Sequence, residues 1–83
     1  MKIEQLKAFV LDDIGAQRFR MSWTKNRLAL WITPCSVPDF ARLVGLEEAN
    51  AGLQAIDHDY TVRFDLSEIC NRHGLDPHEV MPF

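Results

Sequence analysis

Side chains that could bind a partner are concentrated in residues 17–33. Residues 17–23 alternate between apolar and polar side chains, and residues 28–33 form a second apolar, strand-like run. The polar break between them predicts an antiparallel β-hairpin, closed either by a two-residue turn at Lys25-Asn26 or by a four-residue loop. Both closures give the same pairing of the two strands.

This pairing predicts which side chains share a face. It places Arg20 opposite Trp31 on the outer face, where a cation–π contact is favourable. Arginine and tryptophan are also the residues that most often anchor protein interfaces. The candidate partner-binding residues are Arg18, Arg20, Lys25, Arg27 and Trp31. The face predicted to enter the core carries Phe19, Met21, Trp23, Leu28, Leu30 and Ile32.

Two interpretations of the outer face stay open. In the first, the cluster is a contact surface for a partner protein or for a nucleic-acid backbone. In the second, a helix covers Trp31 and the arginines lie at its rim, so that the cluster belongs to the core.

Two segments have the small residue and the later glycine of a helix-turn-helix. They are residues 40–46 and 69–75, and both matches are weak because many glycine-terminated helices fit this spacing. The helix after the first segment would present Glu47 and Glu48, with no Lys or Arg for phosphates. A DNA-binding regulator is therefore an alternative function.

Cysteine and histidine spacing suggests two further sites, which we do not favour. Cys70 and His73 are three residues apart and His78 follows, with Cys35, His58 or Asp59 as further metal ligands. No pattern fixes the fourth ligand, so the prediction is that no metal or other cofactor binds. A thiol–base–orienter set of Cys35, His58 and Asp59 or Asp57 lacks any surrounding signature, so the protein is predicted not to be an enzyme.

Charge divides the chain into a basic and an acidic part. Residues 1–36 hold six Lys/Arg and three Asp/Glu, a net charge of +3, whereas residues 37–83 hold three and nine, a net charge of −6. The simplest explanation of the acidic part is a solvated surface with helix caps. The alternative is an acidic face that mimics nucleic acid and inhibits a nucleic-acid-handling protein; its residues are Glu47, Glu48, Asp57 and Asp59.

The elements that must position these residues follow from periodicity and capping. Helical spacing predicts a helix over residues 2–13, with a strand over residues 8–11 as the alternative. A capping box at Ser36 predicts a helix that ends at Gly45, and Glu47–Ile56 a second one with Leu46, Ala49, Leu53 and Ile56 inward.

The last third of the chain predicts one strand and two helical segments. Residues 60–65 alternate as a third strand, and Asp65 caps a helix over Leu66–His73. Asp76 and Pro77 start a short terminal turn. The predicted fold class is α+β: an antiparallel hairpin plus a third strand, packed against three to five short helices in the order α-β-β-α-α-β-α.

Length and composition set the class of protein. The 83 residues have room for one domain, 1–83, with 47% apolar residues for a modest core. No membrane span or signal peptide is present, so two free thiols in the cytoplasm are expected.

These features favour a small, non-enzymatic protein–protein interaction module, regulatory or inhibitory, with self-association as a homodimer left open. Accessory proteins of phages and mobile elements are often of this kind, by analogy of composition alone.

Overall fold

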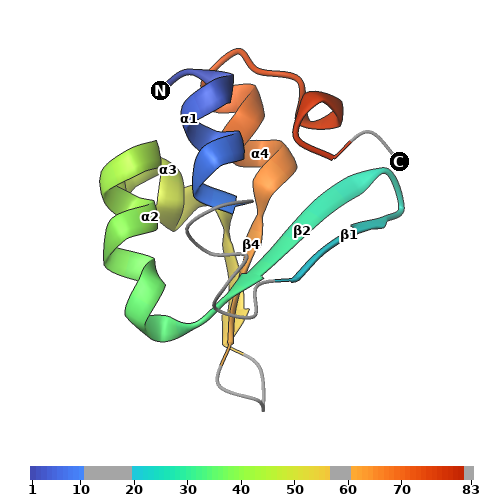
Figure 1. Ribbon diagram of the computed structural model, residues 1–83. Helices are drawn as coiled ribbons and strands as arrows, with labels where there is room; N and C mark the ends of the chain where they lie inside the picture. Colours follow the sequence, from blue (N-terminus) through green and yellow to red (C-terminus); the bar gives the residue numbers. More distant parts are fainter. Residues whose placement is uncertain (11–19, 57–60, 82–83) are drawn as a thin grey trace.

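The computed structural model describes residues 1–10, 20–56 and 61–81 as an α+β domain (Figure 1). The elements, in chain order, are α1 (Ile3–Ala8), β1 (Arg20–Thr24), β2 (Arg27–Ile32), the 3-10 helix η3 (Pro34–Ser36), α2 (Val37–Val44), α3 (Leu46–Gly52), β3 (Leu53–Ile56), β4 (Val62–Asp65), α4 (Leu66–Arg72) and the 3-10 helix η4 (Pro77–Glu79). The predicted fold class is confirmed, with one strand more than expected.

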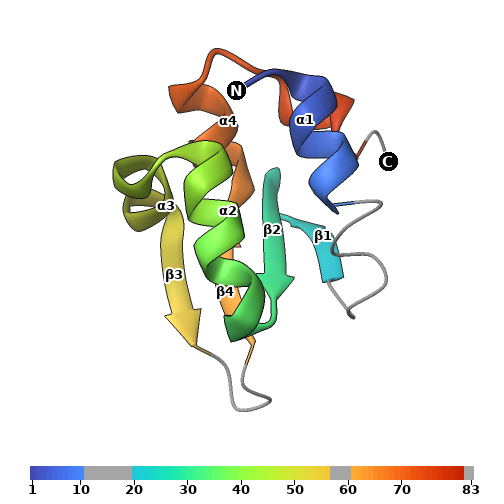
Figure 2. The ribbon, with the colours of Figure 1, turned by 60° about the vertical axis from the view of Figure 1, so that its left-hand side comes forward.

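The sheet has the strand order β1-β2-β4-β3, and every neighbouring pair is antiparallel. Figure 2 shows α1 and α2 lying across one face of it. The hairpin has the predicted register, with Arg20 opposite Trp31 and Trp23 opposite Leu28. The predictions for Arg18 and Phe19 fall outside the described residues.

A two-residue turn closes the hairpin, as the first of the two predicted closures requires. Lys25 and Asn26 have φ values of 50° and 66°. Positive φ at both central residues is typical of the turn whose twist matches that of paired strands. Asparagine tolerates this conformation well, whereas lysine does not, which explains why the sequence signal here was modest.

The core lies between the sheet and the helices. Leu28, Leu30 and Ile32 of β2 are fully buried on the helix side, as predicted. Phe40 of α2 packs between Phe9 and Phe64, with ring centroids 5.8 and 4.8 Å away. The buried apolar residues are Leu6, Phe9, Val10, Leu28, Ala29, Leu30, Ile32, Phe40, Val44, Ala49, Val62, Phe64, Leu66, Ile69, Cys70 and Val80.

The predicted helix over Glu47–Ile56 is wrong in its second half. Helix α3 ends at Gly52, and the next four residues form β3 on the edge of the sheet. Ala49 is buried as predicted, but Leu46, Leu53 and Ile56 are exposed rather than inward. Pairing with β4 satisfies the backbone of this segment and outweighs its helical spacing.

The helix boundaries agree with the caps in two places and differ in two. Asp65 and Asp76 accept backbone N–H groups at the starts of α4 and η4, as predicted. Ser36 precedes α2, but its side chain makes no cap hydrogen bond to that helix. Helix α1 ends at Ala8, short of the predicted residue 13, and residues 11–13 lie outside the described part.

Candidate functional site

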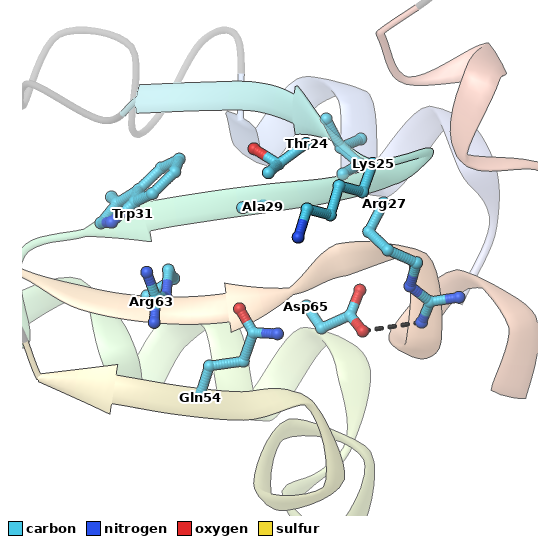
Figure 3. A pocket seen from close by; sticks show the side chains of 9 residues that line it. Thr24, Lys25, Arg27, Ala29, Trp31, Gln54, Arg63 and Asp65 are labelled. Carbon is cyan, nitrogen blue, oxygen red and sulfur yellow. Dashed lines mark hydrogen bonds and ion pairs between the residues drawn. The ribbon is translucent and has the colours of Figure 1, made fainter.

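The face of the sheet opposite α1 and α2 is the candidate site. Figure 3 looks onto this face and shows side chains from three strands and the hairpin turn around a shallow groove, with no described helix above it. We call it the open-face groove; its volume is about 290 Å³, and it is lined by Thr24, Lys25, Arg27, Leu28, Ala29, Trp31, Gln54, Arg63 and Asp65. The interpretation in which a helix covers Trp31 is not supported by the described helices.

The groove is hollow because its floor carries a small side chain. Ala29 lies at the middle of β2 between the paired residues Ser22 and Asp65. On one side of it stand Trp31 and Arg63, and on the other stand Lys25 and Arg27 (Figure 3). Strand β2 therefore supplies both the floor and the indole wall of the groove.

Trp31 is the centre of a row that crosses the sheet. It is opposite Arg20 on β1 and opposite Arg63 on β4, so basic residues flank it on both sides. Its side chain is partly buried. The Arg20 side chain lies outside the described part, so its predicted cation–π contact with Trp31 stays a prediction.

Arg27 has a structural partner within the groove wall. Its Nη2 lies 2.6 Å from Oδ2 of Asp65 and 3.9 Å from Oε2 of Glu68. The hydrogen bond and charge of Asp65, followed by the charge of Glu68, raise the pKa of Arg27 above its ordinary value. Asp65 also caps α4, so this pair fixes the end of the groove rather than leaving Arg27 to bind a ligand.

Lys25 and Arg63 are the two groove cations without an ion pair among the described residues. The Nε atom of Arg63 is buried and has no hydrogen-bond partner there. A buried donor without an acceptor costs roughly 1–3 kcal/mol, which an incoming acceptor would recover. An anionic group placed over Ala29 would lie between these two cations.

Arg63 was not among the sequence-predicted site residues. The alternation of residues 60–65 places Arg63 on the polar face of its strand. Its position beside Trp31 follows only from the pairing of β4 with β2, which periodicity alone does not specify. Combining the third strand with the hairpin register would have found it.

Trp23, predicted to enter the core, instead joins the hairpin tip to the C-terminal segment. Its Nε1 donates to the Met81 carbonyl oxygen at 2.9 Å, and its ring stacks on His78 at a centroid distance of 4.5 Å. The Nδ1 of His78 lies 3.1 Å from Oδ1 of Asp76. Trp23 is therefore only partly buried, at the rim of the core.

The histidines and cysteines of the candidate metal site have separate partners. Cys70 is buried in the core, His73 Nε2 lies 2.6 Å from the Val44 carbonyl oxygen, and His78 stacks on Trp23. Within residues 1–10, 20–56 and 61–81, no three His, Cys, Asp or Glu side chains gather as metal ligands do.

The candidate thiol site is only partly described. Cys35 is exposed, with its sulfur 3.2 Å from Oγ1 of Thr33. Asp57, His58 and Asp59 fall outside the described residues.

The acidic face and the helix pairs are also only partly described. Glu47 and Glu48 lie in the first turn of α3, and Asp57 and Asp59 are outside the described part. Helices α2 and α3 are joined by Gly45 alone, and α3 carries no Lys or Arg. After α4 the described chain continues into the 3-10 helix η4 rather than into a second α-helix.

No helix in the described part of the chain is long and apolar enough to span a bilayer. Comparison of the chain with family models, with curated proteins and with solved structures gives no match.

Proposed function

We propose that this protein is a small, non-enzymatic binding module, regulatory or inhibitory, whose open-face groove takes an acidic segment of a partner protein. The observation that carries the proposal is the pair of groove cations, Lys25 and Arg63, beside the indole of Trp31. Neither cation has an ion pair among the described residues. A carboxylate between them would be held by charge-assisted hydrogen bonds.

The chemistry of the wall supports a peptide rather than a lone anion. Trp31 offers an apolar surface next to the cations, and tryptophan with arginine is the pairing most enriched among residues that dominate binding energy. A standard interface buries roughly 800 Å² per partner. The chain exposes 5131 Å² in all, so such an interface would cover about one sixth of it.

The compartment and biological setting form part of the proposal. The free thiols of Cys35, which is exposed, and Cys70, which is buried, fit a reducing compartment, and we place the protein in the cytoplasm. A regulator of the phage or mobile-element type fits this size and composition by analogy.

The test compares two double variants with equal charge loss. Lys25→Gln with Arg63→Gln removes the groove cations, whereas Lys7→Gln with Arg42→Gln removes two exposed cations from α1 and α2. Binding of a fluorescein-labelled Trp-Glu octapeptide is followed by fluorescence polarisation. The groove variant should bind at least about tenfold more weakly, and the control within about twofold of the wild type. Thermal unfolding establishes that both variants fold.

Three outcomes refute the proposal. The first is equal loss of affinity in both variants, because the attraction is then due to net charge. The second is unchanged binding when Trp31→Ala is combined with the groove variant. The third is tighter binding to a random 20-bp DNA duplex than to the peptide, with an affinity that falls steeply with salt, because the ligand is then nucleic acid.

A further inference from the structure

The second open feature of the molecule is the edge strand β3. It pairs with β4 on one side, and no described strand pairs with it on the other. The described large apolar residues that are exposed lie in it or in the helix before it: Leu53 is 48% exposed, Ile56 73% and Leu46 69%. Exposed apolar side chains on an unpaired strand are typical of an interaction surface.

Strand β3 lacks two common protections of a sheet edge. Its sequence, Leu-Gln-Ala-Ile, contains no charged residue and no proline. The irregularity between Leu53 and Ala55 is the one protective feature of the strand. The unpaired backbone groups of β3 are therefore open to a further strand.

The bulge also sorts the side chains of β3 between the two faces of the sheet. Leu53 is opposite Phe64 and Ile56 is opposite Val62, so both belong to the helix side. Gln54 instead lines the open-face groove, and Ala55 is opposite Arg63 (Figure 3). An added strand would meet apolar side chains on one face and a cation on the other.

We infer that the partner's acidic segment adds to the sheet as a fifth strand along β3, with apolar residues facing Leu53 and Ile56 and acidic residues facing Arg63. This inference rests on the proposed function. The added backbone would lie two strand spacings from β4, roughly 10 Å. Glutamate and arginine side chains span that distance together, and the small Ala55 between them leaves the path clear.

Charge favours a partner of this chemistry over a second copy of the chain. Pairing of β3 with itself would oppose Leu53 to Ile56 and Gln54 to Ala55. The copy's strand carries no carboxylate, so Arg63 would keep its unpartnered Nε. A strand that alternates apolar and acidic residues satisfies both faces at once.

The probes are three labelled ten-residue peptides: one alternates Val and Glu, one has the same residues in two blocks, and one alternates Val and Lys. The alternating Val-Glu peptide should bind at least about tenfold more tightly than the other two. At saturation, backbone amides within Leu53–Ile56 should exchange with solvent at least about tenfold more slowly, because the added strand accepts their hydrogen bonds.

The matched variants are Ile56→Lys on the strand and Leu46→Lys on α3, where an equally exposed apolar residue lies off the strand. A lysine on the edge should weaken binding of the alternating peptide about tenfold, and the α3 variant should leave it unchanged.

The outcomes separate this inference from the proposed function. Binding that needs Lys25 and Arg63 but is indifferent to Ile56→Lys, with no slowing of β3 amide exchange, overturns strand addition and leaves the groove as the binding site. Binding that is indifferent to both sets of variants overturns both. A free protein that sediments as a dimer, and becomes monomeric on Ile56→Lys, shows that a second copy occupies the edge and also overturns the inference.

Discussion

Replacing Gly52 by alanine separates two opposing effects at the junction of α3 and β3. Helix propensity alone favours alanine by up to about 1 kcal/mol. In the structure, however, a Cβ at Gly52 would lie 2.8 Å from both Cγ1 and Cδ1 of Ile69, and 3.2 Å from the carbonyl oxygen of Asp65. Ile69 is fully buried, so its side chain has little room to move.

The expected sign is therefore destabilisation. Overpacking of a buried site costs about 1–3 kcal/mol, and the gain in propensity offsets part of this, leaving a net loss of about 1–2 kcal/mol. For a domain of this size, that corresponds to a fall in Tm of about 5–15 °C. Urea unfolding followed by far-UV circular dichroism measures the free energy, and a thermal scan measures the Tm.

Two controls establish the cause of the Gly52→Ala effect. Ala51→Gly reports the propensity of the exposed neighbouring position and should cost no more than about 1 kcal/mol. Ile69→Val removes Cδ1, so in the double variant part of the overlap is relieved, with a favourable coupling of at least about 0.5 kcal/mol. Stabilisation by Gly52→Ala, or strict additivity with Ile69→Val, would refute the close packing at this junction.

Three further predictions follow from polar contacts of the described residues. Ser67→Ala removes the acceptor, 2.8 Å away, of the buried Leu28 N–H and should cost about 1–3 kcal/mol in urea unfolding, whereas Ser22→Ala should stay within about 0.5 kcal/mol; equal costs would contradict the assigned bond. Burial raises the pKa of the Cys70 thiol to about 11, so iodoacetamide at pH 8 should label Cys35 alone in the folded protein and both thiols in urea; labelling of folded Cys70 as fast as Cys35 would show that it is accessible. Hydrogen bonds from the His78 backbone and ring lower the pKa of Asp76 below its ordinary 3.8, so its contribution to stability is complete above the unfolded pKa and is lost as pH falls through the lower folded value. Asp76→Asn should flatten this acid limb, and an unchanged limb in thermal scans between pH 5 and 2 would assign it to other carboxylates.

The hairpin was predictable because its two signals agree. Side chains alternate with period two on both strands, and any turn centred between Lys25 and Asn26 gives one register. The placement of Trp31 beside Arg20, and the burial of Leu28 and Leu30, follow from that register. Local pattern determined this part of the fold because every inward position was also apolar.

The full open-face groove was not predictable in the same way. Its Trp31, Lys25 and Arg27 come from the hairpin, but Arg63 and Gln54 come from strands that join through long-range pairing. The pairing of Arg27 with Asp65 has the same origin, because these residues are 38 positions apart. Periodicity states which face a residue occupies, and only strand order states its neighbours.

The failed helix over residues 53–56 bears directly on the proposed strand addition. Leu46, Ala49, Leu53 and Ile56 have helical spacing, and a helix would have buried them together. Gly52 ends the helix instead, because its close approach to Ile69 leaves no space for a side chain, and the following residues pair with β4. The cost of that choice is three exposed apolar side chains on one edge of a small sheet. Conflicts between local pattern and final structure concentrate at functional sites. A partner strand on β3 would bury Leu53 and Ile56 and give Arg63 its missing acceptor, and this would resolve the conflict that the isolated chain retains.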